Sequence, residues 1–166
     1  EGAPFAVGER VASGVTGPCG RCDECRSGRP TLCATAFEDN LWGTWADLAR
    51  IPARVVASTL FRVPEGVAPP SAALLDPLAS VLHGLGRLPD PAGRTVLVLG
   101  AGPIALLFTH LLLRRSAARG LVVDRNPARL AGHAALGAEV VPVSGALAPA
   151  VAERTGGRGV DLVVET

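Results

Sequence analysis

Short apolar runs and helical segments alternate strictly from residue 95 to residue 165, and this alternation constrains the fold more than any other feature of the sequence. Four runs are typical of buried strands: TVLVLG at 95–100, GLVVD at 120–124, AEVV at 138–141 and VDLVVE at 160–165. The segments between them, 103–117, 126–137 and 144–157, are typical of helices. Because the strands are apolar on both faces, the pattern predicts a parallel sheet covered by helices.

The turn LGAGPIA, residues 99–105, joins the first of these strands to the first helix. Gly100 permits a tight turn, and Gly102 allows the backbone to approach a pyrophosphate. The helix that begins with Pro103 and Ile104 directs unpaired N–H groups and the positive end of its dipole toward the turn. The sequence therefore predicts that these four residues bind a dinucleotide. A kinase-type phosphate loop is excluded, because no Gly-Lys-Ser/Thr sequence follows the turn.

Two charged residues at the end of the second strand bear on which dinucleotide is bound. Asp124 lies 22 residues after Gly102, where an acidic side chain accepts hydrogen bonds from the adenosine ribose and repels a 2′-phosphate. Arg125 lies beside it and could instead pair with a 2′-phosphate. Asp124 therefore favours NAD as the cofactor, and Arg125 leaves NADP open.

All the cysteines of the chain lie close together, with the spacing Cys19-x2-Cys22-x2-Cys25-x7-Cys33. Four thiolates match the tetrahedral demand of a structural zinc ion, and the longer loop before Cys33 allows the chain to close the site. Disulfides are one alternative, which the tight clustering disfavours. An iron–sulfur cluster is another, although Ala34 follows the fourth cysteine where bacterial ferredoxins have proline.

The first third of the chain differs from the last. It is rich in glycine and proline around short apolar pieces, which predicts irregular β structure. Residues 70–88 have apolar side chains at near-helical spacing and predict a helix or a pair of helices, followed by a hinge at PDPAGR. The sequence thus predicts an α/β protein in two parts, residues 1–88 and residues 89–166.

Composition excludes several classes of function. A net charge of +1 and an aromatic content of 4% provide neither a phosphate-neutralising stripe nor stacking platforms, so nucleic acid is not an expected partner. The sequence has no long apolar run and no signal peptide, so we expect no membrane partner and a cytoplasmic location. Because Tyr is absent, the Tyr/Lys proton relay of short-chain dehydrogenases is excluded. Because Met is absent, we expect a trimmed or partial chain.

The order of the motifs resembles a known family. FAVGERVA precedes the cysteines, and DPLASVLHGL and then VLVLGAGPIA follow them. This arrangement resembles the zinc-containing medium-chain dehydrogenase/reductase family, the alcohol and polyol dehydrogenases. The resemblance implies a partial GroES-like, β-rich catalytic domain with a structural-zinc lobe, followed by a partial Rossmann fold, a doubly wound parallel sheet. It also implies that Cys19, Cys22, Cys25 and Cys33 hold the structural zinc.

The same resemblance implies an activity. Members of the family are NAD-linked oxidoreductases that act on the CH–OH group of an alcohol or polyol by hydride transfer. We therefore expect a small-molecule alcohol as the substrate and a homo-oligomer as the assembly. The alternative function is a catalytically inactive zinc- and nucleotide-binding module with a structural or regulatory role.

The resemblance is incomplete at the catalytic site. In the family, a second, catalytic zinc is held by a Cys and by a Gly-His-Glu segment, and both precede the FxVGxRV stretch. This sequence begins four residues before that stretch and contains neither, so we expect a catalytic zinc in the intact enzyme only. Asp76, in DPLASV, aligns with the Glu-Pro-Leu carboxylate of the family and is a candidate zinc ligand. A carboxylate that caps or braces a helix is the alternative.

The histidines and tryptophans are interpreted as structural. His83, His110 and His133 are isolated in the sequence, and isolated histidines are common in packing and on surfaces. Trp42 and Trp45 lie in NLWGTWADLARIPA, which resembles the Gly-x-x-Ala-Glu-Tyr strand of the family. We therefore expect a strand there, with tryptophans that anchor the core or an interface.

Overall fold

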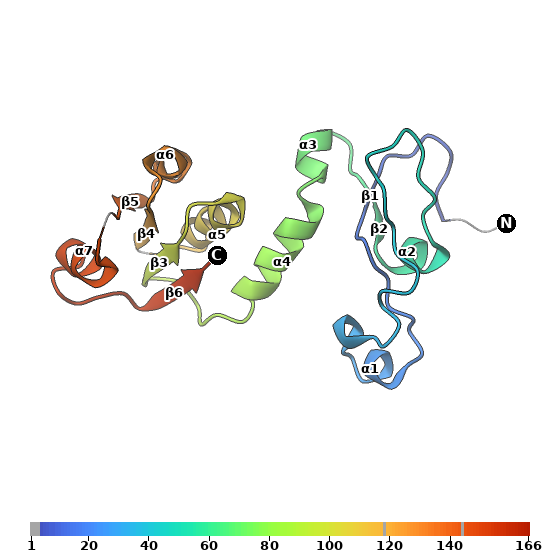
Figure 1. Ribbon diagram of the computed structural model, residues 1–166, viewed down its shortest axis with the longest axis horizontal. Coiled ribbons are helices and arrows are strands. Elements are labelled where there is room, and N and C mark those ends of the chain that lie inside the picture. Colours follow the sequence, from blue (N-terminus) through green and yellow to red (C-terminus); the bar gives the residue numbers. More distant parts are fainter. Residues whose placement is uncertain (1–3, 118, 144) are drawn as a thin grey trace. The chain divides into compact units, whose positions relative to one another are not determined.

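The computed structural model of the chain describes residues 4–117, 119–143 and 145–166. The chain divides into two compact units, Glu1–Asp76 and Pro77–Thr166 (Figure 1). The division falls inside helix α4 (Leu75–Leu85), so that most of this helix belongs to the second unit. The sequence analysis placed the boundary after residue 88, which assigns the whole of α4 to the first part. That domain boundary stays a prediction.

The first unit consists of short elements joined by loops. In chain order they are β1 (Val11–Ser13), α1 (Asp23–Arg26), the 3-10 helix η1 (Pro30–Leu32), α2 (Ala53–Ser58), β2 (Leu60–Arg62) and α3 (Pro69–Ala72). β1 and β2 pair in antiparallel orientation, with Val11 opposite Arg62. Within the described residues, the irregular β structure expected here is this one short ladder.

The loop that carries the four cysteines is attached to helix α2 at two points, one before the first cysteine and one after the last. At the start of the loop, a Cβ atom on Gly17 would lie 2.6 Å from the Arg54 carbonyl oxygen, so the two backbones approach closely only because this residue is glycine. After the last cysteine, the Arg54 guanidinium donates to the Thr35 carbonyl oxygen at 2.5 Å and to the Thr35 hydroxyl at 3.0 Å. The cysteine loop is therefore anchored on one residue of α2.

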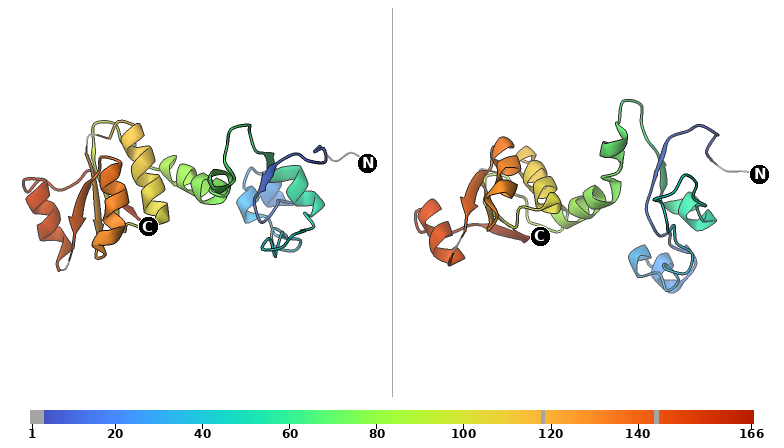
Figure 2. Two further views of the ribbon diagram at one scale, coloured as in Figure 1. Left: turned by 90° about the horizontal axis from the view of Figure 1, so that it is seen from above. Right: turned by 45° about the horizontal axis from the view of Figure 1, so that its top comes forward.

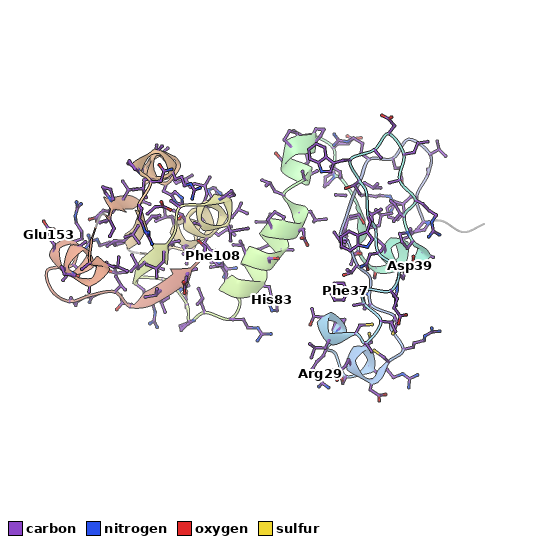
Figure 3. All side chains as sticks on the ribbon, viewed as in Figure 1. Arg29, Phe37, Asp39, His83, Phe108 and Glu153 are labelled. Carbon is purple, nitrogen blue, oxygen red and sulfur yellow. The ribbon has the colours of Figure 1, made fainter. Side chains whose placement is uncertain are left out.

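The stretch around the tryptophans does not form the expected strand. Residues 41–50 contain neither helix nor strand, and Gly43 has a φ of +74°, which interrupts an extended backbone. Trp42 and Trp45 are both exposed, as is Phe37, which Figure 3 labels. The prediction that the tryptophans lie in a strand was wrong. Of the two roles expected for them, anchoring the core is excluded by their exposure, and anchoring an interface stays a prediction.

The second unit alternates strands and helices as its sequence predicts. After α4 come β3 (Thr95–Leu99), α5 (Pro103–Arg114), β4 (Arg119–Asp124), α6 (Pro127–Ala135), β5 (Glu139–Pro142), α7 (Leu147–Arg154) and β6 (Leu162–Glu165). Both α5 and α6 begin with proline, which suits the first turn of a helix because it lacks an N–H group. Membrane crossing needs a longer apolar helix than any found in the described part of the chain.

The four strands form one parallel sheet in the order β5-β4-β3-β6, which confirms the predicted sheet. Two apolar clusters lie on its faces. One contains Val81 of α4, Leu112 of α5 and Leu130 of α6, and the other contains Val151 of α7. Figure 2, left, shows the strands between α7 on one side and α5 and α6 on the other. The sheet is therefore covered by helices on both faces.

The strand order reverses at β3, because β4 and β6 pair with β3 on opposite sides. In open parallel sheets, ligands bind at such a switch point, beyond the carboxyl ends of the strands. Gly100 follows β3 at this position with a φ of +97°. A Cβ atom there would lie 2.9 Å from the carbonyl oxygen of Thr166, which follows β6. Backbone geometry and close packing therefore both require glycine at position 100.

Candidate metal centre and dinucleotide site

The four cysteine sulfur atoms lie within 4.8 Å of one another. In Figure 3 they are the yellow atoms beside α1. Cys22 precedes α1, Cys25 lies in it and Cys33 follows η1, so two short helical turns bring distant sulfur atoms to one point. All four cysteines that the spacing singled out are thus brought together, and none of them forms a disulfide.

Backbone N–H groups stabilise negative charge on two of these thiols. The Cys22 N–H donates to Cys19 Sγ at 3.4 Å, and the Cys19 N–H donates to Cys33 Sγ at 3.3 Å. The N–H groups of Arg21 and Cys22 lower the pKa of the Cys19 thiol to about 6, and the Cys19 N–H lowers the pKa of Cys33. Burial, together with the neighbouring thiols, raises the pKa of Cys25 to about 12. Thiolates this close repel one another, so the fully ionised cluster needs a cation.

The donor set and its size fit one zinc ion. Zinc–sulfur bonds of about 2.3 Å in a tetrahedron place the sulfur atoms about 3.8 Å apart, so this cluster needs only a small contraction to reach that geometry. An iron–sulfur cluster distributes its thiolates over several iron atoms and requires a wider arrangement. A four-sulfur site leaves no open position for a substrate, so a metal bound here has a structural role.

The glycine turn that is predicted to bind a dinucleotide ends at the N-terminus of α5. Gly102 precedes this helix with a φ of −76° and a ψ of 179°, and a Cβ atom on it would meet nothing within 4 Å. The space beside Gly102 is therefore open, in contrast to the crowded Gly100. Pro103 and Ile104 form the start of α5, and both are exposed. The turn has the room and the helix N-terminus that a pyrophosphate requires.

Asp124, the last residue of β4, is oriented by the turn itself. Its Oδ2 accepts from the Ala101 N–H at 2.8 Å, and its Oδ1 accepts from the Asn126 N–H at 2.7 Å. The N–H groups of Asn126 and Ala101 lower the pKa of this carboxyl group, which is therefore ionised at neutral pH. Since a carboxylate has about four lone-pair sites, each oxygen retains the capacity to accept a further hydrogen bond from a ligand hydroxyl.

A cavity of about 460 Å³ lies at the carboxyl ends of β3, β4 and β5 and is bordered by Gly100, Asp124 and Arg125. Its apolar walls come from Leu99, Val123, Val143 and Leu147. An apolar cavity with a fixed carboxylate at its edge suits a flat ring that carries hydroxyl groups, such as adenosine. The structure therefore places both residues that bear on the choice of dinucleotide at the edge of one cavity.

Asp76 lies apart from any comparable cluster. It is an exposed residue in the first turn of α4 and lines a largely apolar cavity of the first unit together with Arg10 and Ser13. Among the residues that the structure describes, Asp76 belongs to no group of three or more metal-ligating side chains. The described residues therefore do not fit a catalytic zinc ion.

The three histidines differ in their surroundings. His83, labelled in Figure 3, and His110 are exposed. His133 is buried, its Nδ1 lies 2.9 Å from Thr109 Oγ1, and its Nε2 has no hydrogen-bond partner within the described residues. Burial lowers the pKa of His133, so that its ring is neutral at pH 7.

Sequence reasoning missed two contacts near the glycine turn at residues 99–105, which is called the dinucleotide turn from here on. The bond from the Ala101 N–H to Asp124 joins residues 23 positions apart, and the Thr109–His133 contact joins residues 24 positions apart. Neither leaves a local pattern. A polar residue among the apolar positions of α5, as Thr109 is, is the only signal that could have indicated the second contact.

Comparison with known proteins agrees with this geometry. Residues 1–64 match the family described as the alcohol dehydrogenase GroES-like domain. The sequence is 30% identical, over 96% of this chain, to the Emericella nidulans protein named "Probable D-xylulose reductase A". It is 35% identical, over 84% of this chain, to L-threonine 3-dehydrogenase of Xanthomonas campestris. The solved alcohol dehydrogenase TADH of Thermus sp. ATN1 matches 98% of the chain with a TM-score of 0.84 and 28% identity.

Together these matches indicate the zinc-containing medium-chain dehydrogenase/reductase family. This confirms the resemblance and the fold class, a GroES-like part followed by part of a Rossmann sheet. A Sinorhizobium meliloti protein solved with bound NADP also matches 98% of the chain, with a TM-score of 0.77 and 28% identity. The chain spans 46% of the length of the xylulose reductase, 41% of that of the threonine dehydrogenase and 49% of that of the Thermus enzyme.

Proposed function

We propose that this chain holds one structural zinc ion and binds NAD, as part of an oxidoreductase that transfers a hydride between the nicotinamide and the CH–OH group of an alcohol or polyol. The observation that carries the nucleotide assignment is Asp124, an ionised carboxylate at the end of β4 that the Ala101 N–H orients beside an apolar cavity. The substrate class rests on the relatives, which are named for xylulose and threonine, small molecules with hydroxyl groups.

Each part of the dinucleotide has a counterpart in the chain. The open space at Gly102 receives the pyrophosphate, whose charge the N–H groups at the start of α5 stabilise. Asp124 accepts hydrogen bonds from the adenosine ribose, and the apolar walls of the cavity hold the adenine ring. When bound, NAD supplies the hydride acceptor. Arg125 borders the same cavity and keeps NADP as the alternative cofactor, in keeping with the NADP-bound relative.

The four cysteines are the ligands of the zinc ion in this proposal. Zinc bound by Cys19, Cys22, Cys25 and Cys33 removes the repulsion between their thiolates and closes the loop that α2 anchors. Reduced thiols at such short separations suit a reducing compartment, which supports a cytoplasmic location. We also propose a homo-oligomer, and this part rests on the family alone.

Calorimetric titration of the chain with NAD and with NADP tests the nucleotide assignment. We expect NAD to bind about 5- to 150-fold more tightly, because Asp124 gains hydrogen bonds with NAD and repels the 2′-phosphate. Asp124→Asn is the variant of choice, since its one remaining oxygen can still accept from the Ala101 N–H, and it should lose most of the preference. Arg125→Ala is the matched control and should change NAD affinity little.

Three outcomes of the titration would contradict the assignment. Binding of neither nucleotide would refute it. Tighter binding of NADP would show that Arg125 sets the choice. Unchanged preference in Asp124→Asn would remove the carboxylate from the ribose site.

Elemental analysis after dialysis against a weak chelator tests the zinc assignment. We expect one zinc per chain. A folded chain without metal, or a chain with stoichiometric iron and sulfide, would contradict it.

A catalytically inactive zinc- and nucleotide-binding module is the second candidate, because Asp76 belongs to no group of metal-ligating side chains among the described residues. We expect residues 1–166 alone to turn over no alcohol, because one carboxylate does not hold a catalytic zinc. Turnover above background on a panel of primary alcohols, secondary alcohols and polyols would exclude the inactive module. It would also require a catalytic group other than Asp76.

A further inference from the structure

The most buried of the four cysteines has a hydrogen-bond partner that the zinc assignment does not use. Cys33 is 6% exposed, whereas the other three cysteines are partly exposed. Its Sγ lies 3.7 Å from the Thr35 hydroxyl oxygen and also accepts from the Cys19 N–H at 3.3 Å. Among the described residues, Thr35 is the one side chain from outside the cluster that forms a hydrogen bond with a cysteine sulfur.

The donor in the contact between Thr35 and Cys33 follows from the partners of each atom. Arg54 Nη2 lies 3.0 Å from Thr35 Oγ1, and a guanidinium only donates, so the hydrogen of the hydroxyl remains for another acceptor. In the described part of the chain, the acceptor within reach is Cys33 Sγ. A cysteine that binds zinc is a thiolate, which has no hydrogen to donate. In the zinc-binding form, Thr35 is therefore the donor and Cys33 the acceptor.

The Arg54 guanidinium fixes the position of this hydroxyl. It also donates to the Thr35 carbonyl oxygen at 2.5 Å, so one planar group holds two oxygen atoms of the same residue. Because the N–H groups of a guanidinium have fixed directions, this arrangement restricts both the peptide and the side chain of Thr35. Arg54 forms no ion pair with a described carboxylate, so no acid competes for it. The next residue of α2, Val55, is fully buried and holds this end of the helix in place.

We propose that Thr35 is a positioning residue for the metal centre, in which Arg54 orients its hydroxyl and the hydroxyl donates to the zinc ligand Cys33. A hydrogen bond to a thiolate stabilises its negative charge, which a buried sulfur atom cannot share with water. The Arg54 charge acts in the same direction, because one zinc ion and four thiolates carry a net negative charge. Helix α2 thus contributes to the affinity of the cysteine loop for zinc as well as to its attachment.

Two substitutions of Thr35 separate the hydroxyl from the packing of the side chain. Thr35→Val has nearly the same shape and lacks the hydroxyl, whereas Thr35→Ser keeps the hydroxyl and loses only the methyl group. Competition with a chromophoric chelator under reducing conditions measures the zinc affinity of the full chain. We expect this affinity to fall about tenfold in Thr35→Val and to stay within about twofold of the wild type in Thr35→Ser.

A second measurement uses Co²⁺ in place of zinc, because its bonds to sulfur absorb light. The absorption in the near ultraviolet moves an electron from sulfur to the metal, and a thiolate that accepts a hydrogen bond gives up that electron less readily. The band should therefore move to longer wavelength in Thr35→Val and stay in place in Thr35→Ser. A change in packing alone leaves the charge on the sulfur atom as it is and predicts no shift.

Arg54→Lys tests whether Arg54 orients the hydroxyl, because lysine keeps the positive charge and lacks the planar fork. The cobalt band should move in the same direction as in Thr35→Val. The double variant should have the band of Thr35→Val alone, since Arg54 acts on the sulfur atom through the hydroxyl. A wild-type band in Arg54→Lys would overturn the orienting role of Arg54. If Thr35→Val does not fold, the band of Arg54→Lys decides the inference by itself.

The inference rests on the proposed zinc site, and the two fail in different ways. A wild-type chain that binds neither zinc nor cobalt refutes the zinc assignment, and the inference with it. If the wild type binds both metals and Thr35→Val has unchanged affinity and an unchanged band, the inference is refuted and the zinc assignment stands. Equal losses of affinity in Thr35→Val and Thr35→Ser without a shift of the band would assign Thr35 a packing role alone, which also overturns the inference.

Discussion

One added methyl group should have different effects at the two glycines of the dinucleotide turn: a loss of stability at Gly100 and a loss of ligand binding at Gly102. At Gly100 a methyl group meets the Thr166 carbonyl oxygen at 2.9 Å and the Thr166 hydroxyl at 3.0 Å, and the φ of +97° disfavours any side chain. At Gly102 the φ of −76° is ordinary for alanine, and nothing lies within 4 Å. Gly100→Ala should therefore damage the fold, and Gly102→Ala should damage only the binding of a ligand.

The magnitudes follow from these contacts. The left-handed backbone costs Gly100→Ala about 1–2 kcal/mol and the close contact about 1–3 kcal/mol, so the free energy of unfolding should fall by about 2–5 kcal/mol. For a unit of this size, that corresponds to a fall in melting temperature of about 10–25 °C. Gly102→Ala exchanges one N-cap residue for another and should cost at most about 1 kcal/mol. Its methyl group, however, occupies the space that the pyrophosphate needs and should weaken NAD binding at least about tenfold.

Differential scanning calorimetry and titration calorimetry on the two variants measure these effects separately. Gly132→Ala is the matched control: it makes the same chemical change inside α6, where the added Cβ meets only Leu106 at 3.5 Å. The control should melt at or slightly above the wild-type temperature and bind NAD normally. Wild-type NAD affinity in Gly102→Ala would refute the placement of the pyrophosphate. A wild-type melting temperature in Gly100→Ala would refute the packing argument.

Three further predictions concern the rest of the chain. Cys22→Ser should release zinc and destabilise the cysteine loop, while NAD affinity stays within about twofold of the wild type. Ser27→Ala, in the same lobe, is the control and should keep its zinc. Loss of both zinc and NAD binding in Cys22→Ser would contradict the independence of the two sites. Burial holds the pKa of His133 below its ordinary value of 6.5, so only the unfolded chain gains that proton as the pH falls below 6.5. Denaturant titrations should therefore show stability falling there, by at most about 1.4 kcal/mol per pH unit, and His133→Gln should flatten this slope; an equal slope in the variant would argue against a buried neutral ring. Gly17→Ala should lower the urea midpoint of the first unit by the equivalent of about 1–3 kcal/mol, since its methyl group would lie 2.6 Å from the Arg54 carbonyl oxygen; an unchanged midpoint would contradict that close approach.

The second unit was predictable because its signals are local. The run TVLVLG, the glycine turn and the proline at the start of α5 each lie within a few residues, and the structure has β3 and α5 where the pattern predicts them. The expected helix over 103–117 ends earlier, at Arg114, and Ser116 adopts a φ of +61° there. Boundaries of this kind depend on how the chain returns to the sheet, which the apolar pattern does not encode.

The first unit was harder to predict, since its structure depends on contacts between distant residues. Helix α2 has the sequence ARVVAS, whose β-branched residues do not favour a helix, and it forms where Val55 is fully buried. The spacing of the cysteines did predict that they share a site, because a zinc ion requires four ligands in a tetrahedron and so relates the spacing to a geometry.

In the second unit, the pairing of Thr109 with His133 was not predictable, because it depends on the packing of α5 against α6.

The strand order β5-β4-β3-β6 leaves two unlike edges in the second unit. At β5, Glu139 forms ion pairs with Arg119 and Arg154, and Pro142 offers no N–H group to a further strand. At β6, Val163 is 51% exposed, and the sequence LVVE presents donors and acceptors without a proline. The sheet is therefore closed to growth beyond β5 and open to it beyond β6, where another strand can add by main-chain hydrogen bonding alone.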